Sequence, residues 1–346
     1  MRLLPKILLT VTVSIISLLI LAEIALRIFG IKPDLGSESN NFFVSDSLLG
    51  WKNSIQNNYQ FYNRDRSYSW TVSTDSSGNR ITSEYDTSCK DYRPSIQIYG
   101  CSFTFGSSVN DSATATYKLQ SMLPKYKVEN KGVCAYGLTQ MYLSLQKSVA
   151  NGDTPKIAIL NYAGFQDMRT PLSKEWGIML WCGYKPNGQF SQFGQMSLPY
   201  YDEENGVLTL KRCAFKDLRT SWPLVAKSSV MYVLFTLYAK WHDDRLADSF
   251  HHISLQLLLQ IMQYCQAHHI IPVMGNFIFN HPDMVVVPND MPDSISHHGY
   301  HVVDYGINVA DSVWNCHPYD RGHPNSMAHT LFANKLFHYL TDKNLW

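Results

Sequence analysis

Short apolar runs alternate with longer helical segments from residue 95 onward, and this alternation constrains the fold more than any other feature of the chain. The predicted strands and helices follow one another over residues 96–99, 112–123, 126–133, 138–152 and 156–164. The third strand is an almost continuous apolar run, which is typical of a strand buried on both faces. Strand–helix alternation at this spacing predicts βαβ units, a parallel sheet and helices on both of its faces.

A stretch rich in tryptophan and tyrosine interrupts the alternation over residues 171–250 and is predicted to be an insertion that contains a helix. A helix, a strand, a second strand and a closing helix are then predicted over 253–269, 270–279, 300–307 and 326–340. The 346 residues are 45% apolar and 16% charged, which is enough to bury a large core. The predicted fold class is α/β, a three-layer α/β/α sandwich with a mainly parallel, flavodoxin-like sheet.

The amino terminus carries a 16-residue run without a charge, Ile7 to Ala22, which two cations precede. At about 1.5 Å per residue this run is shorter than the ~30 Å hydrocarbon core of a bilayer, so residues 24–29 must extend it. Glu23 and Arg27 can pair on one helical face near the interface. The preceding cations predict a cytoplasmic amino terminus and an exported remainder of the chain.

A cleavable signal peptide is the alternative interpretation of the same run. A signal-peptidase cleavage site needs small residues at two positions separated by one residue, and the chain matches this pattern poorly. Ile20 lies two positions before Ala22, and Glu23 lies two positions before Ala25. We therefore predict an uncleaved, single-pass signal anchor over residues 1–30. The rest of the chain is expected to be extracytoplasmic, which means periplasmic in a Gram-negative cell.

Two further parts are predicted after the anchor. Residues 31–92 read as a β-rich juxtamembrane appendage, with a hairpin-like turn at 77–79. Residues 93–346 read as the α/β domain, which contains the insertion 171–250.

Four short blocks of small and polar residues carry the candidate chemistry. Three of them directly follow the first three predicted strands: "YGCSFTFG" at 99–106, "NKGVCAYG" at 130–137 and "GFQD" at 164–167. The fourth, "DRGHPN" at 320–325, precedes the last helix. Ligands of an open parallel sheet bind beyond the carboxyl ends of its strands, so we expect the first three blocks to share one edge of the sheet.

Ser102, in the first block, is the candidate nucleophile. A serine hydroxyl needs a base to remove its proton, and that base needs an acceptor that holds it in one tautomer. Asp320 and His323 lie three residues apart in a turn with glycine and proline, so the carboxylate can reach one ring nitrogen while the other faces Ser102. A lone Asp-x-x-His is more often a solvated turn or a helix cap. The prediction therefore depends on all four blocks occurring together in this order.

These blocks resemble those of the SGNH (GDSL-type) hydrolases, and in particular the membrane-anchored bacterial branch of that family. The resemblance covers roughly residues 95–170 and 250–340. It implies a three-layer sandwich around a parallel sheet of about five strands. It also implies that Ser102 is the nucleophile, that His323 is the general base and then acid, and that Asp320 orients His323.

The resemblance further implies an oxyanion hole made by the backbone N–H groups of Ser102 and Ala135 and by the side-chain amide of Gln166. Ala135 stands where the family usually has glycine, which is costly if the backbone there needs a positive φ. Gln166 stands where the family usually has asparagine and carries the same amide on a longer arm. Losing one such donor costs about 3 kcal/mol of transition-state stabilisation.

Neither a metal nor an organic cofactor is predicted, and nucleic acid is not an expected partner. The seven cysteines contain no CxxC spacing. The adjacent histidine pairs at 251–252, 268–269 and 297–298 point apart on a helix or a strand and are predicted to be solvated. A net charge of +1 with mixed signs provides no basic stripe.

The predicted function is that of an exported serine hydrolase that acts on ester bonds through an acyl-enzyme, with an acylated envelope glycan or lipid as substrate. The choice of an ester follows from the resemblance. An O-acyltransferase on the same scaffold is the first alternative, in which a carbohydrate hydroxyl replaces water in the second step. A catalytically silent envelope protein that binds a glycan is the second alternative, motivated by Ala135 and Gln166.

Overall fold

The structure is a computed structural model that describes residues 3–33, 42–63, 65–84, 92–183, 196–218, 222, 224–225, 227–278, 290–306, 314–316 and 319–345. Parts of the predicted appendage and of the predicted insertion therefore lie outside the described residues. The chain divides into two compact units. The smaller unit contains 1–39, 173–195 and 214–246, and the larger contains 40–172, 196–213 and 247–346.

The larger unit is built on a five-stranded sheet, and all of its neighbouring strands pair in parallel. Its strands are β5 (Ser95–Gly100), β6 (Lys127–Gly132), β7 (Ile157–Ala163), β10 (Ile271–Phe277) and β11 (His301–Asp304). They lie in the order β6-β5-β7-β10-β11, so the predicted parallel sheet of flavodoxin-like order is confirmed. The direction of winding reverses between β5 and β7, and open α/β sheets bind ligands at this switch point.

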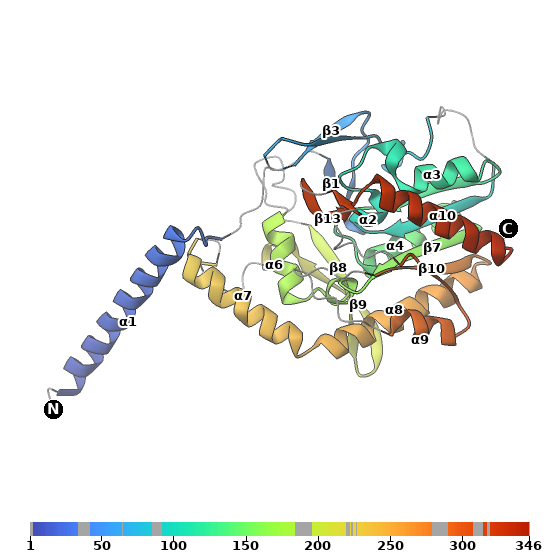
Figure 1. Ribbon diagram of the computed structural model, residues 1–346. Coiled ribbons are helices and arrows are strands. Elements are labelled where there is room, and N and C mark those ends of the chain that lie inside the picture. The colour runs from blue at the N-terminus through green and yellow to red at the C-terminus, as the bar shows by residue number, and fades with distance from the viewer. Residues whose placement is uncertain are drawn as a thin grey trace. The chain divides into compact units, whose positions relative to one another are not determined.

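Helices cover both faces of this sheet (Figure 1). One face carries α3 (Ala115–Met122) and α10 (Ser326–Asp342), and the other carries α4 (Leu138–Ala150), α8 (Ala247–Ala267) and α9 (Met291–His297). Each layer buries its own apolar cluster against the strands, so the core has two halves separated by the sheet. The predicted three-layer α/β/α sandwich is therefore confirmed.

Side chains at the helix starts explain where two of these helices begin. The Thr114 hydroxyl accepts from the Tyr117 N–H at the start of α3. The Asn325 amide oxygen accepts from the N–H groups of Met327 and Ala328 at the start of α10. Such N-caps satisfy N–H groups that have no partner inside the helix.

Four antiparallel strand pairs accompany the parallel sheet among the described residues of the larger unit. They pair β1 (Phe43–Asp46) with β2 (Gly50–Asn53), β3 (Tyr59–Tyr62) with β4 (Ser69–Val72), β8 (Ser197–Glu204) with β9 (Val207–Ala214), and β12 (Asn315–Cys316) with β13 (Asp320–Pro324). The turn predicted at 77–79 is present, because the Asp75 carboxylate accepts from the N–H groups of Ser77 and Asn79. An isolated bridge between Thr74 and Arg80 closes this turn.

The smaller unit contains three long helices: α1 (Leu3–Ile28), α6 (Lys174–Gly183) and α7 (Ser229–Asp244). Among the described residues, α1 is the one helix long and apolar enough to cross a membrane, over Leu4–Ile28 with a mean hydropathy of 2.5. A signal sequence has the same length and composition. The apolar face of α7 packs with α6 and buries Phe235 and Ala239.

Candidate functional site

Ser102 opens a four-residue helix, α2 (Ser102–Phe105), directly after β5. Gly106 ends this helix in the left-handed conformation, with φ 84°, which glycine adopts without strain. A Cβ atom on Gly100 would lie 1.9 Å from the Thr104 hydroxyl oxygen, so only glycine fits there. Cys101 points into the core and is 1% exposed. This tight turn puts Ser102 where β5 ends, beside the switch point of the sheet.

Asp320 and His323 are in direct contact on β13 (Asp320–Pro324), where His323 Nδ1 lies 2.7 Å from Asp320 Oδ2. The same carboxylate accepts from the Ser108 hydroxyl at 2.5 Å and from the Gly322 N–H at 2.9 Å. Burial alone would raise the pKa of Asp320. The hydrogen bond and the charge of His323 lower it, as do the hydrogen bonds from Ser108 and Gly322, so the pKa of this carboxyl is well below its usual range. Asp320 is therefore a carboxylate that can orient an imidazole.

The first and fourth blocks lie against each other. Helix α2 packs against β13, and the Phe103 ring centroid lies 5.6 Å from that of His323. The Ser108–Asp320 hydrogen bond joins residues 212 positions apart in the sequence. The chain segment that begins with Ser102 is thus held beside the Asp320–His323 pair, and the individual roles of these residues stay predictions.

The second block contains Ala135, which has a φ of 69° in the turn after β6. This is the left-handed region, so alanine bears here the strain that glycine would avoid. The neighbouring Cys134 Sγ lies 3.2 Å from the hydroxyl of Ser107, which directly follows the first block. Burial raises the pKa of the Cys134 thiol to about 12, with Ser107 opposing the shift, so this cysteine stays protonated and is a poor nucleophile.

The third block contains Gln166, the first residue of α5 (Gln166–Arg169), and its side chain is fully buried. Its Nε2 donates to the backbone carbonyl of Asn161 at 3.1 Å, on the strand that precedes the block. Its Oε1 is buried and has no hydrogen-bond partner among the described residues. One N–H of the amide is therefore bound to the end of β7, and the oxyanion role of Gln166 stays a prediction.

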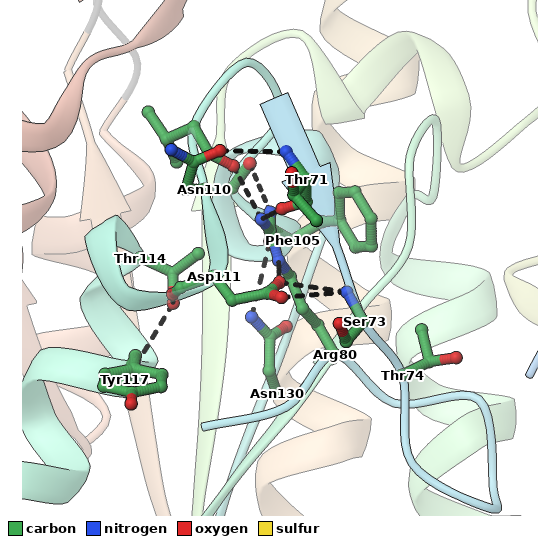
Figure 2. A network of polar contacts seen from close by, with 12 residues as sticks. Thr71, Ser73, Thr74, Arg80, Phe105, Asn110, Asp111, Thr114, Tyr117 and Asn130 are labelled. Atoms are coloured by element: carbon green, nitrogen blue, oxygen red, sulfur yellow. Dashed lines mark hydrogen bonds and ion pairs between the residues drawn. The ribbon is translucent and has the colours of Figure 1, made fainter. Parts of the chain in front are cut away.

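Arg80, which the sequence analysis did not single out, stabilises the loop after α2 (Figure 2). It lies in the predicted appendage and is only 1% exposed. Its Nε lies 2.8 Å from the Asp111 carboxylate. Its terminal nitrogens donate to backbone carbonyls of the loop, at Phe105, Gly106 and Val109. A fully buried guanidinium with a carboxylate partner fixes the path of the chain from Ser102 to Asp111.

His251 also differs from the sequence prediction of a solvated side chain. Its Nδ1 lies 2.8 Å from the Asp167 carboxylate, and its Nε2 lies 2.9 Å from the Asp290 carboxylate. Tyr162 donates to the other oxygen of Asp167 at 2.8 Å. The hydrogen bond with Asp167 raises the pKa of His251, burial opposes the rise, and Asp290 adds to it. A histidine pairing with two acids thus joins the third block to α8.

A cluster of metal-binding side chains is not found in the part of the chain that the structure describes, where no group of three or more histidines, cysteines or acids could hold an ion. The His251 site has two carboxylates and one imidazole, and both ring nitrogens are already bonded to the carboxylates.

No family model matches the chain, and no curated protein matches it. Solved structures do match it. A protein from Desulfitobacterium hafniense, described as lipolytic and of the G-D-S-L family, is 15% identical with a TM-score of 0.39, over 72% of this chain and 100% of that chain. A member of the lipolytic G-D-S-L family from Veillonella parvula is 11% identical with a TM-score of 0.40, over 71% of this chain and 98% of that chain.

The psychrotrophic esterase EstA from Pseudoalteromonas sp. is 9% identical with a TM-score of 0.40, over 72% of this chain and 98% of that chain. The first two descriptions name the family that the four sequence blocks resemble. The likeness of all three structures to this chain is too distant to assign a reaction or a site residue.

Proposed function

We propose that this protein is a serine hydrolase that acts on esters, with Ser102 as the nucleophile. The observation that carries the proposal is the Asp320–His323 pair, held beside the Ser102 segment by the Ser108 hydroxyl and the Phe103 ring. Asp320 occupies Nδ1 of the imidazole, which leaves Nε2 as the basic nitrogen of neutral His323. That nitrogen is the group that can take the serine proton.

In the proposed reaction, Ser102 Oγ attacks the ester carbonyl as its proton passes to His323. The backbone N–H groups of Ser102 and Ala135 donate to the developing oxyanion. His323 then protonates the departing alcohol, which leaves an acyl group on Ser102. Water, deprotonated by His323, attacks this acyl-enzyme and releases the acid, and the proton returns to Ser102.

We further propose that the substrate is an acylated glycan or lipid of the cell envelope and that α1 anchors the catalytic unit outside the cytoplasm. The length and hydropathy of α1 support the anchor. A pair of stacked rings, Tyr68 and Tyr319, supports a ring-shaped alcohol half of the substrate. Their centroids lie 4.8 Å apart, and Tyr319 is 46% exposed directly before Asp320. Exposed aromatic rings next to convergent polar groups are typical of ligand sites.

Active-site labelling tests the nucleophile and its competence together. The full chain in detergent is treated with a fluorophosphonate, and the modified residue is mapped by mass spectrometry. We expect the label on Ser102 and none in Ser102→Ala, which should also lose hydrolysis of p-nitrophenyl acetate by up to ~10⁶-fold. Ser121→Ala is the control, because Ser121 is exposed on α3 and bonds only to its own helix. A label on any other residue contradicts the proposal.

A catalytically silent glycan-binding protein is the second candidate, and the commitment of the Gln166 amide to Asn161 favours it. An oxyanion hole with two donors in place of three would stabilise the transition state less. A folded protein that binds an envelope glycan, takes no fluorophosphonate and turns over no ester would establish this candidate. If Ser102 is labelled and the ester is hydrolysed, a carbohydrate acceptor is added to separate the two enzyme classes. An O-acyltransferase then forms acylated carbohydrate, whereas a hydrolase releases free acid.

A further inference from the structure

Helix α7 has two opposite apolar faces, of which one is covered by protein. Phe235 and Ala239 face α6 and are buried. Leu234, Leu237 and Trp241 lie on the opposite side, at spacings of three and four residues, and are 46%, 61% and 55% exposed. Residues at that spacing form one stripe along a helix. A stripe of large apolar side chains that no element in the described part of the chain covers indicates an interaction surface.

The start of α7 is bonded to the end of α1. The Glu23 carboxylate accepts from the N–H groups of Ser229 and Val230, both at 3.0 Å, and from the Ser228 hydroxyl at 2.8 Å. These are N–H groups of the first turn of α7, which lack partners inside that helix. Arg27 is paired with the same carboxylate at 2.6 Å. Because Glu23 lies in the last turns of the candidate membrane span, α7 begins at the depth where that span ends.

Helix α7 then runs crosswise to α1 within the smaller unit (Figure 1). A helix that starts at the end of a membrane span and runs across its axis follows the plane of the membrane surface. Its exposed side also has the chemistry of an interfacial helix, with Trp241 on the apolar stripe, the Arg245 guanidinium 4.8 Å over its ring and Lys240 exposed nearby. Tryptophan at the headgroup level and flanking cations are typical of such helices.

We propose that α7 lies in the outer interface of the membrane that α1 crosses, with Leu234, Leu237 and Trp241 buried between the headgroups and the acyl chains. The occupant of the exposed stripe is thus the lipid bilayer. The inference rests on the anchor in the proposed function and is independent of the catalytic assignment. The tether through α1 keeps the helix close to the surface, so a short apolar stripe is sufficient for binding.

This arrangement assigns a role to the insertion, which the catalytic chemistry leaves unexplained. Helices α6 and α7 belong to the same compact unit as α1, although 145 residues separate α1 from α6 and 200 separate it from α7 in the sequence. The insertion then serves as a second, interfacial attachment to the membrane. A single span can rotate and tilt, whereas a span bonded to a surface helix has a fixed orientation.

Photo-crosslinking in vesicles tests the proposal on the full chain. p-Benzoylphenylalanine is placed at Leu237, at Leu18 in α1 or at Thr236, and each protein is reconstituted in vesicles of phosphatidylethanolamine and phosphatidylglycerol. Thr236 is the matched control, because it is exposed next to Leu237 but lies on another side of the helix. We expect lipid adducts from positions 18 and 237 after illumination and a several-fold loss of adduct at 236.

The other outcomes overturn the inference in distinguishable ways. Adducts at 18 without adducts at 237 mean that α1 is in the membrane and α7 is not. A protein adduct at 237 means that a second copy, or the larger unit of the same chain, covers the stripe. Equal adducts at 236 and 237 rule out a face-specific contact. Loss of lipid adducts at all three positions removes the anchor and the inference together, while the Ser102 labelling experiment is unaffected.

Discussion

Ala135 carries backbone strain in the candidate site, as Ser108 does, because their φ angles of 69° and 66° belong to the left-handed region. A left-handed L-residue costs about 1–2 kcal/mol relative to the right-handed conformation. The protein keeps alanine at this position although glycine would avoid the cost. The strain lies at the backbone N–H that we assign to the oxyanion, and strained backbone is commonly retained at functional sites.

Replacing Ala135 by glycine should therefore stabilise the fold. Relief of the left-handed strain exceeds the extra chain entropy of glycine, which is about 0.4–1 kcal/mol, so we expect the free energy of unfolding to rise by up to ~1 kcal/mol. Urea denaturation measures this change. The matched control is Ala150→Gly at the exposed end of α4, which should lower the free energy of unfolding by up to ~1 kcal/mol. A loss of stability in Ala135→Gly would contradict the interpretation.

His251 should make stability depend on pH. Its folded-state pKa is raised above the ordinary value of about 6.5, mainly by Asp167 and further by Asp290. Because the pKa is raised, protonated His251 contributes its full stabilisation of the fold below the unfolded-state pKa. This contribution is lost as pH rises through the folded-state pKa. We expect the Tm difference between wild type and His251→Gln to be largest below about pH 6.5 and to shrink at higher pH.

The neighbouring histidine provides the control for this measurement. His252 is mostly exposed, with its Nε2 3.5 Å from the Glu203 carboxylate. His252→Gln should therefore change Tm little at any pH, because exposed pairs contribute at most ~1 kcal/mol. A Tm difference for His251→Gln that stays constant across the titration would show that packing, and not the two carboxylates, stabilises this residue.

At the scale of elements, a buried polar network joins the appendage to the α/β sheet. Arg80 lies in the appendage, and its guanidinium reaches the segment from the end of α2 to the start of α3. There it donates to three backbone carbonyls and forms an ion pair with Asp111 (Figure 2). Asp111 in turn accepts from the Ser73 N–H. The loop that follows the candidate nucleophile is therefore held from outside the sheet.

Removing the Arg80 guanidinium should be severe. Arg80→Met removes the cation from a partly buried carboxylate and leaves several buried carbonyls without this partner, so we expect a loss of about 3–5 kcal/mol in the free energy of unfolding. Arg80→Lys should recover only part of this loss, because an ammonium cannot reproduce the planar fork. Chemical denaturation measures both variants. Lys125→Met, at an exposed position, is the control and should stay within about 0.5 kcal/mol of wild type.

The elements themselves follow from local sequence patterns. The predicted helix at 138–152 is α4 at Leu138–Ala150, and the predicted strand at 156–164 is β7 at Ile157–Ala163. Their periodicity and their bounding Gly and Asn residues act over a few positions, so the sequence shows them directly. Arg80 gave no such signal, because an isolated arginine in a polar segment looks solvated until its neighbours are known.

At the scale of the whole molecule, the proposed anchor α1 sets where the proposed reaction would take place. An uncleaved anchor predicts that the protein isolated from membranes still begins at its first residues. Mass spectrometry of the intact chain should therefore include the peptide up to Arg27, and alkaline carbonate should leave the protein in the membrane fraction. Deleting residues 1–30 should release it to the soluble fraction. A mature chain that begins near residue 26 would establish a cleaved signal peptide instead.

The α/β class, the parallel sheet, its helical layers, the three blocks that follow strands and the block before the last helix can be recognised from the sequence, because each depends on residues close together in the chain. Tertiary structure alone decided that Gln166 is buried against Asn161, that His251 pairs with two acids, and that Arg80 reaches the loop after Ser102. Those contacts join segments whose proximity depends on how the elements pack. A side chain's partner and its exposure are properties of that packing, and no local pattern encodes them.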